Sequence, residues 1–149
     1  SAFAELRKFA ATAKDEVVLQ SLMTAIMGFD RPDAQAISAQ YLRAAPDDVF
    51  SAMSQELIEQ LRQVDAHSFK NTSNEVINRY LEYGRSPQAS GTRRAMAYQV
   101  AFRLAVKVGG NDAEARIKGL LSEMQSSGVR EVQDALPPLA KDAATIGIK

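Results

Sequence analysis

The chain has 149 residues, its 18 Lys or Arg equal its 18 Asp or Glu, 46% of its residues are hydrophobic, and it has no cysteine. This composition excludes disulfides, thiolate metal sites and cysteine nucleophiles, and it argues against disorder or a fibrous repeat. The length fits one compact domain with its own core. We expect a single helical domain over residues 1–149, with roughly the last ten residues forming a loose tail.

The first part of the chain predicts three short amphipathic helices. The segment AFAELRKFAATAK spaces its apolar residues along one stripe, as a helix does. Asp15 can cap a second helix, and Gly28 offers that helix a left-handed stop. Pro32 suits the first turn of a third helix, which runs to Pro46.

Two further helices are predicted in the middle of the chain. The run DDVFSAMSQELIEQLRQV has helical spacing, with Asp47 and Asp48 at the positive helix start. Thr72 and Glu75 have the spacing of a capping box for the next helix, and Gly84 is expected to end it.

The segment 92–108 has two interpretations. Its apolar residues alternate with others from Tyr98 to Val108, which is a strand pattern. No second run offers a partner strand, so we expect a helix. On a helical wheel Gln99, Arg103 and Lys107 share one narrow arc, and apolar residues and alanines fill nearly all the rest. We expect this helix to be the most buried one.

The last third predicts two helices. Asn111 and Glu114 have capping spacing ahead of a helix, with Gly128 beyond its end. The final stretch predicts a short helix stopped by Pro137 and Pro138.

The expected fold class is therefore all-α, a single compact bundle of about seven or eight short helices. The alternative is a short HEAT-like α-solenoid, but the capping signals are unevenly spaced and no repeated signature aligns across them.

No residue pattern predicts catalysis, a metal or a cofactor. His67 is the single histidine and no recognisable nucleophile accompanies it, so we expect no function for it. Asp47 with Asp48 is interpreted as helix capping, and Glu56 with Glu59 as a solvated face. The glycines of GGND at 109–112 match neither a Walker loop nor a dinucleotide fingerprint.

A basic stretch carries the strongest functional signal. The loop GRSPQASG leads into paired arginines at a predicted helix start capped by Thr92, where cations are mildly unfavourable unless a negative group compensates. Glu82 is the one acid within 79–107, against six cations. These cations are Arg79, Arg85, Arg93, Arg94, Arg103 and Lys107.

We expect a non-enzymatic protein-interaction module that uses residues 84–94 on an acidic surface of another protein. The candidate partner-binding residues are Arg85, Arg93, Arg94, Tyr83, Arg103 and Lys107, with Tyr83 as an exposed ring and Tyr80 in the core. The alternatives are nucleic-acid or phosphate binding by the basic stretch 79–118, or an enzyme without a recognisable motif. The intramolecular alternative is that the arginines face the acidic N-terminal half of the chain.

The compartment stays open. No apolar run reaches the roughly 20 residues of a membrane span, so we expect a soluble chain, cytoplasmic or exported without disulfides. The high Ala, Ser and Gln content with no Cys weakly suggests a bacterial effector or a secretion-linked domain.

Overall fold

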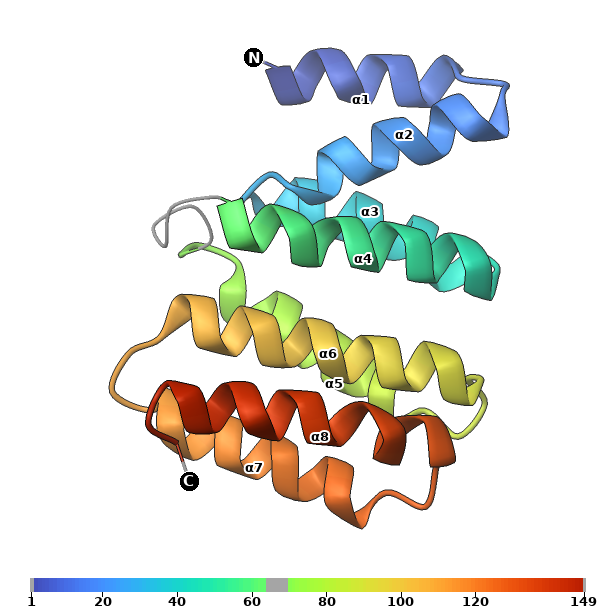
Figure 1. Cartoon of the computed structure of the whole chain (residues 1–149). Helices are drawn as coiled ribbons and strands as arrows, with labels where there is room; N and C mark the ends of the chain where they lie inside the picture. Colours follow the sequence, from blue (N-terminus) through green and yellow to red (C-terminus); the bar gives the residue numbers. More distant parts are fainter. Residues whose placement is uncertain (1, 64–69, 149) are drawn as a thin grey trace. The chain divides into compact units, whose positions relative to one another are not determined.

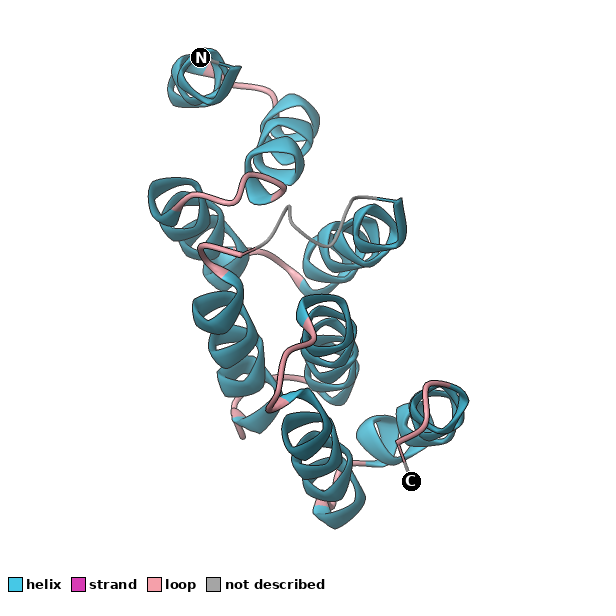
Figure 2. Cartoon of the chain, turned by 90° about the vertical axis from the view of Figure 1, so that its left-hand side faces the viewer, coloured by secondary structure: helices cyan, strands magenta, loops and turns pink. Residues whose placement is uncertain are grey.

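The computed structural model describes residues 2–63 and 70–148, and among them it shows eight α-helices and no strand (Figure 1). Helix covers 81% of these residues, which confirms the all-α prediction and the expected number of helices. The described loops, drawn in pink in Figure 2, are short. The helices are α1 (Ala2–Thr12), α2 (Glu16–Met27), α3 (Pro32–Ala44), α4 (Asp47–Gln63), α5 (Ser73–Arg85), α6 (Gly91–Val108), α7 (Ala113–Ser126) and α8 (Arg130–Thr145).

By its internal contacts the chain divides into two compact units, Ser1–Ser73 and Asn74–Lys149. In the first unit α2 packs against α1, α3 and α4. Gln20 of α2 and Glu56 of α4 line one shallow groove. Gly28, at the end of α2, lies next to Gln60, which follows Glu56 along α4. Helices α2 and α4 therefore run parallel, so the hairpins α1–α2 and α3–α4 stack in the same sense. Our expectation of a single domain stays a prediction.

The second unit is built in the same way. Arg116 of α7 bonds Asn74 near the start of α5, and Glu123 of α7 bonds Arg85 at the end of α5. These two helices therefore run parallel, and α6 packs against both α7 and α8. Parallel stacking of helix hairpins within a unit is the arrangement of α-solenoid repeats, which is the alternative fold that the sequence left open.

Helix α6 is the most buried of the described helices, as the sequence predicted. Eight of its residues are buried, against six in α4 and three in α7. Val100, Phe102 and Leu104 are fully covered, and the alanines beside them let neighbouring helices approach closely. The strand interpretation of 92–108 is wrong because this segment lies in α6.

Several predicted helix starts are confirmed. The Asp15 carboxylate accepts the N–H groups of Val17 at 2.8 Å and Val18 at 3.4 Å, which caps α2. Pro32 occupies the first position of α3. Asp47 and Asp48 lie in the first turn of α4, where their charges favour the helix dipole.

Other predicted helix ends are wrong, because side chains distant in sequence take their place. Gly28 has a right-handed conformation with φ −77°, so it is not a left-handed stop. Thr72 forms no capping box with Glu75, since its hydroxyl donates to Asp30 at 2.7 Å. Asp30 also accepts the backbone N–H groups of Asn71 and Thr72 at 2.9 Å, just ahead of α5.

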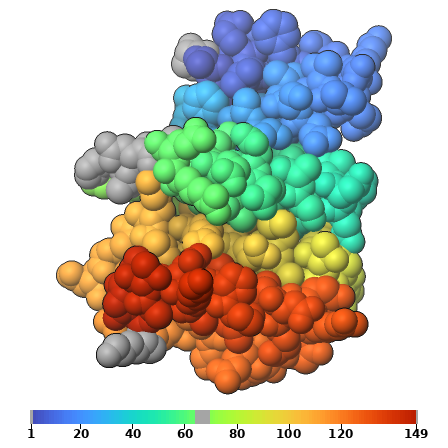
Figure 3. Space-filling view, in the orientation of Figure 1, coloured from blue at the N-terminus to red at the C-terminus, as the bar shows by residue number. Residues whose placement is uncertain are grey.

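Helix α8 does not stop at its prolines, contrary to the sequence prediction. Pro137 and Pro138 each remove one helical hydrogen bond, yet the helix runs through both. Its buried stripe of Val132, Leu139 and Ala143 packs within the unit and offsets this loss. Figure 3 shows residues of α8, in red, at the surface of the second unit.

The described residues 140–148 also depart from the predicted loose tail. They belong to α8 and to its C-terminal cap, where Gly147 adopts φ +88°. The N–H of Ile148 then donates to the carbonyl of Ala143 at 2.9 Å, the closing bond of a Schellman motif.

A glutamine closes one helix turn in each unit. The buried Gln35 side chain donates from Nε2 to the carbonyls of Met27 and Phe29, both at 2.8 Å, at the end of α2. The Gln133 side chain donates to the carbonyls of Met124 at 3.0 Å and Gln125 at 2.8 Å, and to Ser127. Each glutamine is the fourth residue of its own helix, so α3 and α8 satisfy open carbonyls at the end of the preceding helix in the same way.

We expect Gln35→Leu to destabilise the protein by about 1–3 kcal/mol, because buried carbonyls lose their donor. Urea unfolding measures the change. Gln40→Leu is the matched control, since Gln40 is exposed on the same helix and forms no such bond. Equal stability of the two variants would show that the Gln35 bonds contribute nothing.

Candidate functional site

The loop predicted from residues 84–94 is present and exposed. Helix α5 ends at Arg85 and α6 begins at Gly91, with Pro87, Gln88 and Ser90 exposed between them. The hydroxyl of Ser90 accepts the N–H of Arg93 at 3.1 Å, so Ser90 is the cap and the predicted cap at Thr92 is wrong.

Glu123 of α7 connects three helices of the second unit. Arg85 of α5 donates to both of its carboxylate oxygens at 2.8–3.1 Å. The hydroxyl of Tyr98 in α6 donates to the same carboxylate at 2.6 Å. Such charge-assisted bonds are shorter and stronger than neutral ones. Arg85 is therefore committed to its own fold, although 55% of its side chain stays exposed.

This network shifts the pKa of each member. Burial raises the pKa of the Glu123 carboxyl, but the hydrogen bonds from Arg85 and Tyr98 outweigh burial and hold this pKa below its usual range. Burial and the adjacent Glu123 carboxylate both raise the pKa of the Tyr98 hydroxyl, so it remains a proton donor at neutral pH. The bond to Glu123 raises the pKa of Arg85.

Gly84 allows α5 and α6 to approach each other. A Cβ at this position would lie 2.8 Å from the ring of Tyr98. The Arg94 Nε donates to the Gly84 carbonyl at 2.8 Å, which places a cation at the negative end of α5. Gly84 is thus a packing residue within the last turn of α5, and the prediction that it ends the helix is wrong.

The start of α6 carries its own compensating charge. The Glu131 carboxylate lies against Gly91, in the space that a Cβ would fill. Gly91 opens the same helical turn that holds Arg93 and Arg94. A carboxylate at the positive helix end offsets the unfavourable cations that the sequence placed there.

The remaining predicted site residues are also placed within the fold. Arg103 pairs with Asp142 of α8 at 2.6 Å, and Lys107 lies in the last turn of α6, where a cation is favourable. Tyr80 is in the core as predicted, at 2% exposure. The prediction that Tyr83 is an exposed ring is wrong, because its ring is half-buried and packs edge-on against the Tyr80 ring at 5.5 Å.

The acids that the structure shows for these cations come from the C-terminal half of the chain. Glu123 lies 38 residues after Arg85, and Asp142 lies 39 residues after Arg103. The intramolecular alternative had placed these acids in the N-terminal half of the chain.

The sequence did not predict a groove that lies between α5 and α7. It has a volume of about 270 Å³. Gly119 lies in the middle of α7, exposed, with nothing within 4 Å of the position that its Cβ would take. A glycine inside an otherwise regular helix was the sequence signal that could have indicated this groove. The lining residues are Leu81, Arg85, Ala115, Arg116, Gly119, Leu120 and Glu123.

The other sequence candidates do not assemble into a site. Within 2–63 and 70–148 no three His, Asp or Glu side chains come together in a way that could hold a metal ion. Glu59 pairs with Arg62 at 3.3 Å on the exposed face of α4. His67 lies outside the described residues.

No protein-family model matches the chain, and the searches of curated proteins and of solved structures found no match either. None of the described helices is long and apolar enough to cross a membrane.

The lowered pKa of Glu123 predicts a pH dependence of stability. A depressed carboxyl pKa contributes stability above its unfolded value, and this contribution is lost as pH falls through the folded pKa. We therefore expect Glu123→Gln to lose less stability than the parent between about pH 5 and pH 3. Thermal melts across this range measure the difference, and parallel curves would contradict the role of the network.

We expect Arg93→Glu with Arg94→Glu to melt below the parent, by about 1–2 kcal/mol of stability, because Gly84 loses its donor and Glu131 gains like charges nearby. Arg130→Glu is the control, since its side chain is 90% exposed and its nearest acid lies 3.9 Å away. A double variant as stable as the parent would instead assign these arginines to an external partner.

Proposed function

We propose that the protein is a non-enzymatic helical interaction module that binds an acidic surface of another protein through the α5–α7 groove. Arg85 belongs both to this groove and to the basic loop 84–94 that the sequence singled out. The proposal keeps the predicted class of partner and moves the contact surface from the loop onto the two helices.

Gly119 carries this proposal. Glycine inside a helix costs about 1 kcal/mol relative to alanine, so its presence calls for a compensating reason. Within the fold a Cβ at this position would meet nothing, so packing does not require glycine. An exposed helix surface without a side chain instead lets a partner's side chain or backbone approach α7 closely.

The groove keeps an excess of positive charge for an acidic partner, because it is lined by two arginines and by one acid, Glu123, which already bonds Arg85. Arg85 and Arg116 lie at different points along the groove, with exposed side-chain fractions of 55% and 27%. Leu81, Ala115 and Leu120 supply apolar surface in the same groove. Arginines around an apolar centre are typical of energetically important positions in protein interfaces.

Nucleic-acid or phosphate binding by 79–118 is the alternative that the experiment separates. Most cations of this stretch already bond acceptors within the unit, and a nucleic acid would have to compete with these acceptors. Binding of that kind weakens steeply with salt.

The first test uses stability and binding together. We expect Gly119→Ala to stabilise the protein by about 0.5–1 kcal/mol, because alanine favours the helix. The same methyl group fills part of the groove, so binding should weaken while stability rises. Gln125→Ala is the control, because this exposed residue lies on the opposite side of α7.

A photo-crosslinking amino acid at Ala115, beside the groove, measures binding in cells that produce the protein. We expect an adduct with an acidic protein at Ala115, none at position 125, and less adduct when Gly119→Ala is added. Equal adducts at both positions, no adduct at Ala115, or an adduct with nucleic acid would overturn the proposal.

A further inference from the structure

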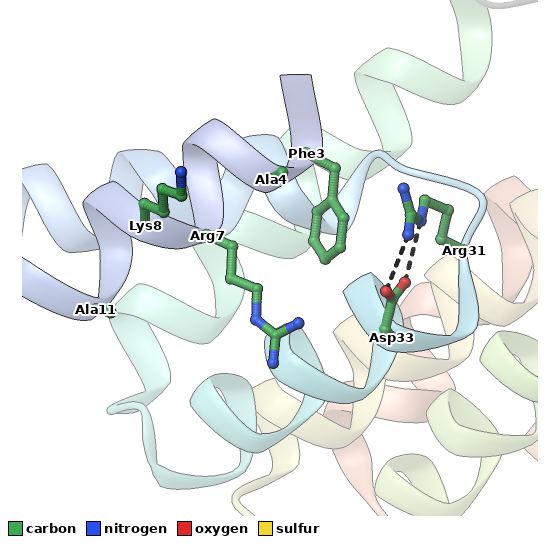
Figure 4. Close-up of a pocket in the computed structure, with 7 residues that line it drawn as sticks. All are labelled: Phe3, Ala4, Arg7, Lys8, Ala11, Arg31 and Asp33. Atoms are coloured by element: carbon green, nitrogen blue, oxygen red, sulfur yellow. Dashed lines mark hydrogen bonds and ion pairs between the residues drawn. The ribbon is translucent and has the colours of Figure 1, made fainter. Parts of the chain in front are cut away.

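The first unit contains a second groove that is independent of the proposed interaction surface. It has a volume of about 410 Å³ and lies between α1 and the start of α3 (Figure 4). Ala4 and Ala11 each lie three or four residues from the adjacent pair Arg7 and Lys8, so the four residues share one face of α1. Phe3, Arg31 and Asp33 complete the lining.

Contacts with Phe3 and Asp33 fix the planar guanidinium of Arg31 inside this groove. Its guanidinium lies over the ring of Phe3 at 4.5 Å and donates to both oxygens of Asp33 at 3.1 Å. Phe3 is buried, while 48% of the Arg31 side chain is exposed. One face of the guanidinium is thus covered by an aromatic ring, and the exposed remainder offers a planar surface on which a second ring can stack.

Arg7 adds a cation without an internal counterion. No carboxylate among the described residues pairs with Arg7 or Lys8, whereas the one acid of the groove, Asp33, is taken by Arg31. In Figure 4 the Arg7 side chain extends from α1 past the Phe3 ring toward α3, and Lys8 lies further along α1. Three cations and one acid leave the groove with an excess of positive charge.

We propose that this groove binds a small organic anion that carries an aromatic ring and a phosphate or carboxylate group. The guanidinium of Arg7 pairs with the anionic group, and Lys8 adds long-range attraction at the rim. The ring stacks on Arg31 and rests on the small side chains Ala4 and Ala11. The volume of about 410 Å³ lies in the range of small-molecule sites.

Asp33 sets the charge that the ligand meets. It neutralises one of the three cations and holds Arg31 in place by two hydrogen bonds. Asp33→Asn keeps one acceptor for Arg31 and removes the negative charge, so it should strengthen the binding of an anion. Arg7→Ala should weaken it, and alanine is well tolerated in an exposed helix. Opposite effects from these two variants cannot come from a general loss of structure.

The test uses phenyl phosphate as the probe, followed by amide chemical shifts of the full chain. We expect saturable shifts at residues 3–11 and 31–33, at least about tenfold weaker binding for Arg7→Ala, and tighter binding for Asp33→Asn. Inorganic phosphate and benzyl alcohol should each bind more weakly than phenyl phosphate, because each has only half of the recognised chemistry. Benzoate in place of phenyl phosphate distinguishes a carboxylate ligand from a phosphate ligand.

Lys14→Ala is the matched control, since it removes an exposed cation outside the groove. If Lys14→Ala weakens binding as much as Arg7→Ala does, the probe responds only to the general positive charge of the chain, and the proposal is overturned. Shifts scattered over the basic residues of the chain, or no saturable shift, would also overturn the proposal.

Discussion

Short helices cannot bury their apolar stripes alone, and this constraint organises both units. The described helices have 11 to 18 residues, a length at which isolated helices are marginal in water. Each is stabilised by packing into a hairpin and by stacking that hairpin on the next. Polar bonds then fix how the hairpins stack, through Gln35 between α2 and α3 in the first unit and through Glu123 of α7 in the second. Gln133 fixes the turn between α7 and α8.

The helices themselves could be predicted because their signals are local. Asp15 caps α2 through residues two and three positions away, and Pro32 needs only its own fixed φ. The burial of α6 also followed from sequence, because a nearly all-round apolar wheel leaves few positions for solvent.

Several ends and caps could not be predicted, because their causes lie far along the chain. Asp30 bonds Thr72 across 42 residues, and Gln35 reaches back over the loop that precedes α3. Pro137 and Pro138 were interpreted by their local effect alone, whereas the buried stripe of α8 decides the outcome. Gly84 was interpreted as a helix stop, but its lack of a side chain instead leaves room for the ring of Tyr98.

In the basic stretch the sequence correctly showed an excess of cations, but the acids that pair with them lie far along the chain. The excess of cations is real, and the sequence left their partner open. The structure places Glu123 on Arg85, Asp142 on Arg103 and Glu131 at the start of α6. What remains for a partner is the exposed surface between these pairs, above all the α5–α7 groove beside Gly119. The paired cations therefore hold the fold, and the groove surface beside them is left for recognition.

The most direct test of whether these ion pairs stabilise the fold is a double-mutant cycle on Arg85 and Glu123. It is measured by urea unfolding of Arg85→Ala, Glu123→Ala and the double variant. Because Arg85 donates to both carboxylate oxygens of Glu123, we expect a coupling free energy of about 0.5–1 kcal/mol between these two residues. Strictly additive effects would contradict the account, because the bonds between Arg85 and Glu123 would then contribute nothing to the stability of the fold.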